Sequence, residues 1–190
     1  EEASGRKGMD MIGVIDAHSP EVQDELTDLL DHGFAIEHGN GGIIYKETML
    51  ILGCEVEVKE EGRGEAHCLV YLTTIRELQA CVGELGGLLI PAHIFTPHKG
   101  LYGRCTDSMA DVLDPAAIHA VELGLSANTT MADQITELHD KTFLTNSDAH
   151  SLGKIGREYQ AIQMGERSYL EWKMAIQRVD GRKVTVNYGL

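Results

Sequence analysis

Short apolar runs alternate with helical segments along most of this 190-residue chain, and this alternation limits its fold more than any other feature. The apolar runs predict strands over residues 11–15, 49–58, 66–72, 88–93, 116–126 and 141–145. Segments between them have turn-spaced apolar residues or cap signals and predict helices over 20–32, 74–85 and 131–139. Strands that alternate with helices are typical of an α/β fold with a largely parallel sheet or barrel.

Two helix ends carry specific boundary residues. Ser19 can cap a helix that begins at Pro20, because a serine side chain accepts from the first free N–H groups and proline is favoured in the first turn. Gly86 and Gly87 stop the second helix. These residues support the predicted order of elements.

The composition fits one soluble globular domain over residues 1–190, with 43% hydrophobic and 24% charged residues. No apolar run reaches the roughly 18 residues that a membrane span needs. The four cysteines form no CxxC pair, which favours reduced thiols and predicts a cytoplasmic protein. The formal charge of −14 disfavours nucleic-acid binding unless a local basic patch or a bound metal ion overrides it.

Acids and histidines recur at or near the carboxyl ends of the predicted strands, where α/β proteins gather their functional groups. They are Asp16, Glu55, His93, Glu122, Asp148 and His150. His67 is an exception, because it lies near the start of its predicted strand. A single histidine at a strand end is more often structural, but six such positions together indicate a site.

The segment "TNSDAHSLG" places Asp148 and His150 two residues apart. In an extended segment such residues point to the same side, so a carboxylate and an imidazole would converge. Asn, Ser and Asp also favour turns, so a plain loop remains the alternative. A mixed His, Asp and Glu set without cysteine suits Zn, Mn or Fe ions.

Several motifs together resemble a known family. "GVIDAHSP", "GCEVEV", "HCLVYL", "PAHIFTPHKGLYG", "VELGLS" and "TNSDAHSLGKIGREY" occur in the order found in the polymerase and histidinol phosphatase (PHP) superfamily, with most similarity to its endonuclease Q group. The resemblance runs from Gly8 to Tyr159. It implies a distorted, TIM-like β/α barrel of about seven strands, with a centre of two or three divalent metal ions.

The resemblance also implies roles for individual residues. Metal ligation is implied for Asp16, Glu55, His67, His93, Asp148 and His150. Catalytic roles fall on Asp148, which would help to handle the attacking water, and on His150 and Glu122. Candidate substrate contacts are His98, Lys99 and Arg157, with solvated surface charges as the alternative for the two basic residues.

The chain departs from the family pattern in two places, and one of its predicted connections is unusually short. No histidine precedes Asp16, so the His-x-His pair of the family's first strand has no counterpart. The strand that ends at residue 72 meets the helix at residue 74 with almost no connection. The cysteine-rich C-terminal region of endonuclease Q proteins is also absent from this chain. We therefore expect the domain to be incomplete at its N-terminus and around residue 72.

These observations predict a metal-dependent phosphoesterase. At the level of the endonuclease Q group, it would nick DNA beside deaminated bases or abasic sites. The alternatives are a small-molecule phosphatase of the histidinol-phosphate type, acting on a phosphorylated small molecule, and a non-catalytic metal-binding domain. The acidic composition slightly favours the phosphatase.

Overall fold

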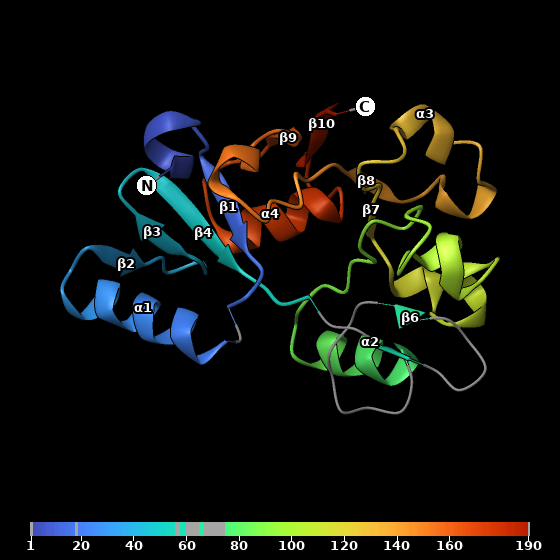
Figure 1. The fold of residues 1–190 in the computed structure, drawn as a ribbon, viewed down its shortest axis with the longest axis horizontal. Helices are drawn as coiled ribbons and strands as arrows, with labels where there is room; N and C mark the ends of the chain where they lie inside the picture. The colour runs from blue at the N-terminus through green and yellow to red at the C-terminus, as the bar shows by residue number, and fades with distance from the viewer. Residues whose placement is uncertain (1, 18, 56–57, 60–64, 67–74, 190) are drawn as a thin grey trace.

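The computed structural model describes residues 2–17, 19–55, 58–59, 65–66 and 75–189. Its α-helices are α1 (Pro20–Asp31), α2 (Ile75–Glu84), α3 (Thr129–Ala132) and α4 (Tyr169–Ile176). A sheet with α1 lies on the left in Figure 1, and α2, α3, β7 (Ala120–Glu122) and β8 (Thr142–Leu144) lie on the right. The α/β class is therefore confirmed.

The left-hand sheet has the order β1-β4-β3-β2. Its strands are β1 (Met11–Val14), β4 (Thr48–Leu52), β3 (Ile43–Tyr45) and β2 (Ala35–Glu37). β1 and β4 are parallel, and the other neighbours are antiparallel. Gly42 has φ +94 between β2 and β3, and a Cβ there would lie 2.5 Å from Met49 Sδ, so this tight connection requires glycine.

The right-hand half contains the larger hydrophobic core. β7 and β8 are parallel, with Ala120 opposite Thr142 and Glu122 opposite Leu144. Fully buried side chains around them include Ile94, Met109, Leu113, Ile118, Leu123 and Leu138. Each such side chain stabilises the fold by about 1.5–3 kcal/mol relative to an exposed one. This half therefore provides a rigid base for the ends of β7 and β8.

α4 covers β7 and β8 in a second, smaller cluster. The Ser168 side chain caps α4 by accepting from the Glu171 N–H, and Ile176 is buried with Ala120 and Leu144. β9 (Tyr159–Gln163) and β10 (Lys183–Tyr188) form an antiparallel ribbon with a register shift between Val184 and Val186. β10 also contacts β8.

Short elements complete the described chain. β5 (Val58–Lys59) and β6 (Glu65–Ala66) form an antiparallel pair. π-helical turns occur at Glu2–Arg6 and Leu101–Cys105. 3₁₀ turns occur at Met109–Asp111, Pro115–Ala117, Thr136–Leu138 and Leu152–Lys154.

Several predicted boundaries are confirmed, and others are wrong. The strand at 11–15, the Ser19-capped helix at 20–32, the helix at 74–85 and the strand at 141–145 are present with small end differences. The predicted strand at 49–58 ends at Leu52, and 116–126 contains a 3₁₀ turn before β7. The predicted helix at 131–139 is α3 followed by a 3₁₀ turn. Residues 67–72 of the predicted third strand lie outside the described residues.

The predicted strand at 88–93 is wrong for a local reason. Its segment does lie along β7, because Glu122 N–H donates to the Pro91 carbonyl and Ile94 N–H donates to the Glu122 carbonyl, both at 3.0 Å. His93 has φ +30, however, and this left-handed residue interrupts the regular ladder.

The strands of the described residues form separate sheets, so a closed barrel is not seen in this part of the chain. No helix among the described residues is long and apolar enough to cross a membrane.

Candidate active site

Side chains from four separate segments form a carboxylate–histidine cluster, which we define as Glu55, His93, Glu122 and Asp148. Glu55 follows β4, Glu122 ends β7, and Asp148 follows β8. Glu55 Oε1 lies 3.2 Å from His93 Nε2. The charges of Glu55, Asp148 and Glu122 all act on His93. The strand ends therefore bring these predicted site residues together.

The carboxylates of the cluster repel one another. Burial raises the pKa of Glu122 to about 7, and the charges of Asp148 and Glu55 act in the same sense. His93 and a hydrogen bond with Asn146 oppose this shift. The hydrogen bond with Glu55 raises the pKa of His93 against the effect of burial. Such a site favours the binding of a proton or a cation.

The backbone at the cluster adopts unusual conformations. His93 has φ +30 and Asp148 has φ +44, which are left-handed values for residues other than glycine. Each such residue costs about 1–3 kcal/mol, and such strain concentrates at functional sites. The surrounding structure therefore holds both side chains in place at a cost in stability.

Gly124 allows the close approach of β7 to His93. It has φ +73, and a Cβ at this position would lie 2.8 Å from the His93 Cβ and 3.1 Å from its Cα. Any other residue would require His93 or the segment after β7 to shift. Gly124 was not predicted as a site residue, although it lies within the "VELGLS" motif.

Close packing and hydrogen bonds fix the loop that follows His93. Gly100 and Gly103 pack so closely on the Thr96 carbonyl that a Cβ on either would overlap it. The Tyr102 hydroxyl donates to Glu137 at 2.7 Å, and the same carboxylate accepts from Met109 N–H at 3.1 Å. The fold therefore limits how far this loop can move.

Asp148 and His150 are in contact, although Asp148 is left-handed and the segment is not the extended one from which the contact was predicted. His150 Nε2 lies 3.2 Å from Asp148 Oδ1, with 81% of the histidine side chain and 46% of the aspartate side chain exposed. Arg157 supports the same loop, because its Nη2 donates to the Ser147 carbonyl at 3.3 Å. Its Nε also donates to the Glu158 carboxylate at 2.6 Å.

The other predicted site residues are placed less directly. Asp16 is exposed, and its backbone forms a bridge with Cys54, so it lies beside Glu55. His67 lies outside the described residues. His98 is exposed in a turn at 97–99, and Lys99 has φ +67 in the same turn. Roles for these residues remain predictions.

Two lysines at the loop that follows His150 were missed by the sequence reasoning. Lys7 Nζ donates to the Gly153 carbonyl at 3.3 Å across 146 residues of chain, and Lys154 ends the neighbouring 3₁₀ turn. Both are exposed. We call Lys7, Lys154 and Arg157 the basic rim. No local pattern signals Lys7, because its position depends on the tertiary fold.

The donor set of the cluster fits a divalent metal ion. Carboxylate and imidazole are ordinary ligands of Zn, Mn and Fe, and a cation would relieve the repulsion that raises the pKa of Glu122. Within the described part of the chain, no three His, Cys, Asp or Glu side chains already stand at ligand spacing. The predicted ligand His67 is not in that part.

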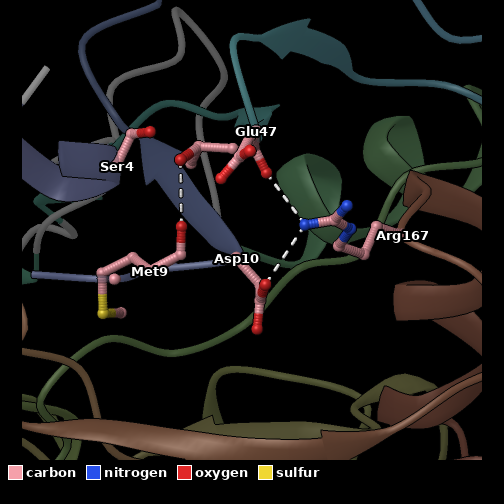
Figure 2. A pocket seen from close by; sticks show the side chains of 7 residues that line it. Ser4, Met9, Asp10, Glu47 and Arg167 are labelled. Carbon is pink, nitrogen blue, oxygen red and sulfur yellow. Dashed lines mark hydrogen bonds and ion pairs between the residues drawn. The ribbon is translucent and has the colours of Figure 1, made fainter.

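A cavity of about 210 Å³ lies at the opposite ends of β1 and β4 from the cluster (Figure 2). Arg167 Nη1 donates there to Asp10 Oδ1 at 3.1 Å and to the Glu47 carbonyl at 2.8 Å. Thr48 Oγ1 donates to the Met9 carbonyl at 3.0 Å. These contacts stabilise the amino ends of the strands. Residues at this end of α/β proteins usually contribute to stability rather than to catalysis.

Known proteins match this chain in sequence and in structure, although no family model matches it. Uncharacterized protein YqxK of Bacillus subtilis is 43% identical over 219 residues, covering 100% of this chain and 57% of YqxK. Uncharacterized protein MJ0043 of Methanocaldococcus jannaschii is 43% identical over 103 residues, covering 50% of this chain and 12% of that protein.

The lesion-specific endonuclease PfuEndoQ from Pyrococcus furiosus superposes with a TM-score of 0.84 and 29% identity, covering 100% of this chain. An endonuclease Q complex with a 27-mer duplex, which has an abasic lesion at its active site, gives a TM-score of 0.82 and 31% identity over 97% of this chain. This chain resembles endonuclease Q. It spans 52% of each endonuclease Q chain, about half their length. PsfC from Pseudomonas syringae, at 16% identity and a TM-score of 0.62, shares the fold alone.

Proposed function

We propose that this chain carries the catalytic site of an endonuclease Q-like nuclease, which nicks DNA beside deaminated bases or abasic sites in a metal-dependent reaction. The observation that carries the proposal is the convergence of Glu55, His93, Glu122 and Asp148 within a fold like that of endonuclease Q. The neighbour with an abasic duplex at its active site supports DNA as the substrate class.

Two or three Zn, Mn or Fe ions would be held by the predicted ligands. These are Asp16, Glu55, His67, His93, Asp148 and His150. When bound, such ions polarise the phosphate oxygens and lower the pKa of the attacking water. Glu55 and His93 are already in contact, so this pair would serve as one part of the ligand set.

The side chains of the cluster also handle protons. Asp148, whose side chain is 46% exposed against 36% for Glu55, would orient the attacking water and accept its proton. Glu122, with a pKa of about 7, exists in both protonation states near neutral pH and would exchange a proton within the site. His150 would assist through its contact with Asp148.

Substrate contacts would come from the polar residues around the cluster. Arg157 bonds the Ser147 carbonyl and the Glu158 carboxylate with its side chain 41% exposed, and its guanidinium would contact a phosphate. His98 and Lys99 occupy the turn that follows the His93 loop and would contact the DNA from that side. These contacts would offset part of the formal charge of −14.

The test compares three substrates under one set of conditions with Mn or Zn added. They are a duplex with one abasic site or one deaminated base, the same duplex undamaged, and a generic phosphomonoester. We expect nicking of the damaged duplexes only, at a fixed position beside the lesion. Equal cutting of the undamaged duplex would refute lesion specificity.

A small-molecule phosphatase of the histidinol-phosphate type is the second candidate, and the acidic composition favours it. It predicts rapid hydrolysis of the phosphomonoester and no nicking of any duplex. A non-catalytic metal-binding domain predicts neither reaction, together with retained metal binding.

A further inference from the structure

Two exposed tyrosines stack on each other at the end of the β9–β10 ribbon. Tyr159 opens β9, Tyr188 closes β10, and the two residues are directly opposite in the ladder. Their ring centroids lie 4.7 Å apart with an angle of 20° between the planes. Tyr159 is 40% exposed and Tyr188 is 45% exposed. The pair therefore presents a preformed aromatic surface to solvent.

The ribbon end that carries this pair is tied to the strand end that carries the cluster. Gln160 Oε1 accepts from Thr145 N–H at 3.1 Å, and Gln160 Nε2 donates to Asn146 Oδ1 at 3.2 Å. Asn146 in turn bonds Glu122. On the β10 side, Asn187 Nδ2 donates to the Phe143 carbonyl at 3.1 Å. Figure 1 shows β8, β9 and β10 close together near the C-terminus.

Lys154 and Arg157 of the basic rim come just before β9 in the chain. Arg157 precedes Tyr159 by two residues, and Lys154 lies in the turn just before it. Lys7 joins them through its contact with Gly153. Stacked aromatic rings beside Lys and Arg side chains are the combination with which proteins hold unpaired nucleic acid, because bases stack on the rings while cations contact the phosphates.

We infer that Tyr159, Tyr188 and the basic rim form a binding surface for an unpaired nucleotide stretch of the DNA strand that enters the cluster. This inference rests on the proposed function. An abasic site leaves the opposite base without a partner, and chemistry at a damaged nucleotide requires it to leave the stack. An aromatic surface beside the cluster can stack such an unpaired base. Intact duplex offers no free base face to it.

The rings alone could also serve only to stabilise the ribbon, because cross-strand aromatic pairs do so. Conservative variants separate the two roles. Tyr159→Phe and Tyr188→Phe keep the ring stack, whereas Tyr159→Ala and Tyr188→Ala remove it. Phe34→Ala is the matched control, since Phe34 is 67% exposed, stacks on His32 and lies just before β2, far in sequence from the tyrosine pair.

The experiment is a fluorescence-anisotropy titration of the whole chain at about 0.15 M salt, with a labelled single strand, an undamaged duplex and a duplex with one abasic site. Each Ala variant should weaken binding of the single strand and the abasic duplex by about 5- to 150-fold, as loss of one stacked base predicts. The Phe variants, the Phe34→Ala control and binding of the undamaged duplex should change little. Thermal unfolding checks that each variant is folded.

Three outcomes overturn the inference in distinguishable ways. If the wild type prefers the abasic duplex and folded Ala variants bind it equally well, the tyrosines do not contact DNA, while the proposed function stands. If the Phe variants bind as weakly as the Ala variants, stacking is not the interaction. If the wild type neither prefers nor nicks the abasic duplex, the proposed function fails and this inference fails with it.

Discussion

Replacement of Glu122 by glutamine should stabilise the metal-free chain at pH 8 and have little effect at pH 5. Burial and the neighbouring acids raise the pKa of this carboxyl from 4.5 to about 7 in the folded chain. The folded chain therefore binds this proton more tightly than the unfolded chain. The free energy of unfolding falls as pH rises from about 4.5 to 7, and the full cost applies above pH 7.

The size of this effect follows from the two pKa values. Their difference corresponds to about 3 kcal/mol against the folded, ionised carboxylate at pH 8. Glutamine keeps the size of the side chain and removes the charge at every pH. For a chain of this length, a gain of about 3 kcal/mol raises Tm by roughly 6–12 °C. Loss of attraction to His93 makes this an upper bound.

The assay is thermal unfolding of both proteins in a chelator at several values of pH. The raised pKa of His93 acts in the same sense, because its stabilisation is present below pH 6.5 and is lost as pH rises through its folded value. The variant should therefore reduce the pH dependence without abolishing it. Addition of Zn or Mn should reduce the pH dependence of Tm in the wild type, because a cation neutralises the same charges.

Glu137→Gln is the control for this prediction. Glu137 is a partly buried carboxylate that accepts from Tyr102, Ser108 and Met109. Its replacement should destabilise the chain at both pH values. If Glu122→Gln instead lowers Tm at pH 8, or changes Tm equally at pH 5 and pH 8, then ionised Glu122 does not destabilise the fold. The electrostatic account of the cluster would then be wrong.

Three further substitutions test other parts of the site. Gly124→Ala should lower the free energy of unfolding by more than Gly86→Ala. Both glycines have φ +73, but only at Gly124 would a Cβ lie 2.8 Å from the His93 Cβ. Equal losses of about 1 kcal/mol would show that this contact is unimportant. Asp148→Asn should reduce nicking by about 10²- to 10⁴-fold while the chain stays folded, whereas Asp180→Asn, at a similar left-handed φ of +49, should leave nicking intact. Comparable rates for the two variants would remove Asp148 from the mechanism. Arg157→Ala should weaken DNA binding on every lesion and reduce the slope of log Kd against log salt by about one, and an unchanged slope would exclude a phosphate contact.

The sequence predicted those helices and strands whose caps and apolar spacing lie within the element itself. α1 has its cap at Ser19 and its proline at the first position, and β1 and β8 are apolar runs beside polar loops. β10 was missed although Val184, Val186 and Tyr188 alternate with polar residues, so its signal was present. The segment at 88–93 failed as a strand because the left-handed His93 is set by packing against Gly124 and β7.

The cluster itself was largely predicted from acids and histidines at predicted strand ends, although β4 and the β7–β8 pair belong to separate sheets in the described chain. Glu55, His93, Glu122 and Asp148 were all predicted site residues, and the structure brings them together. Arg157 of the basic rim was a predicted substrate contact, but Lys7, Lys154 and the tyrosine pair were not predicted. Lys7 reaches Gly153 across 146 residues, and a pairing between β9 and β10 has no local signature.

Single-turnover nicking of a duplex with one abasic site tests the central claim most directly. The wild type is stripped of metal, assayed, and assayed again after addition of Mn or Zn, with Asp148→Asn and the undamaged duplex in parallel. The account predicts a nick beside the lesion only after metal is returned, and only with the wild type on the damaged duplex. A nick that persists without metal, or one that Asp148→Asn makes at the wild-type rate, would contradict it.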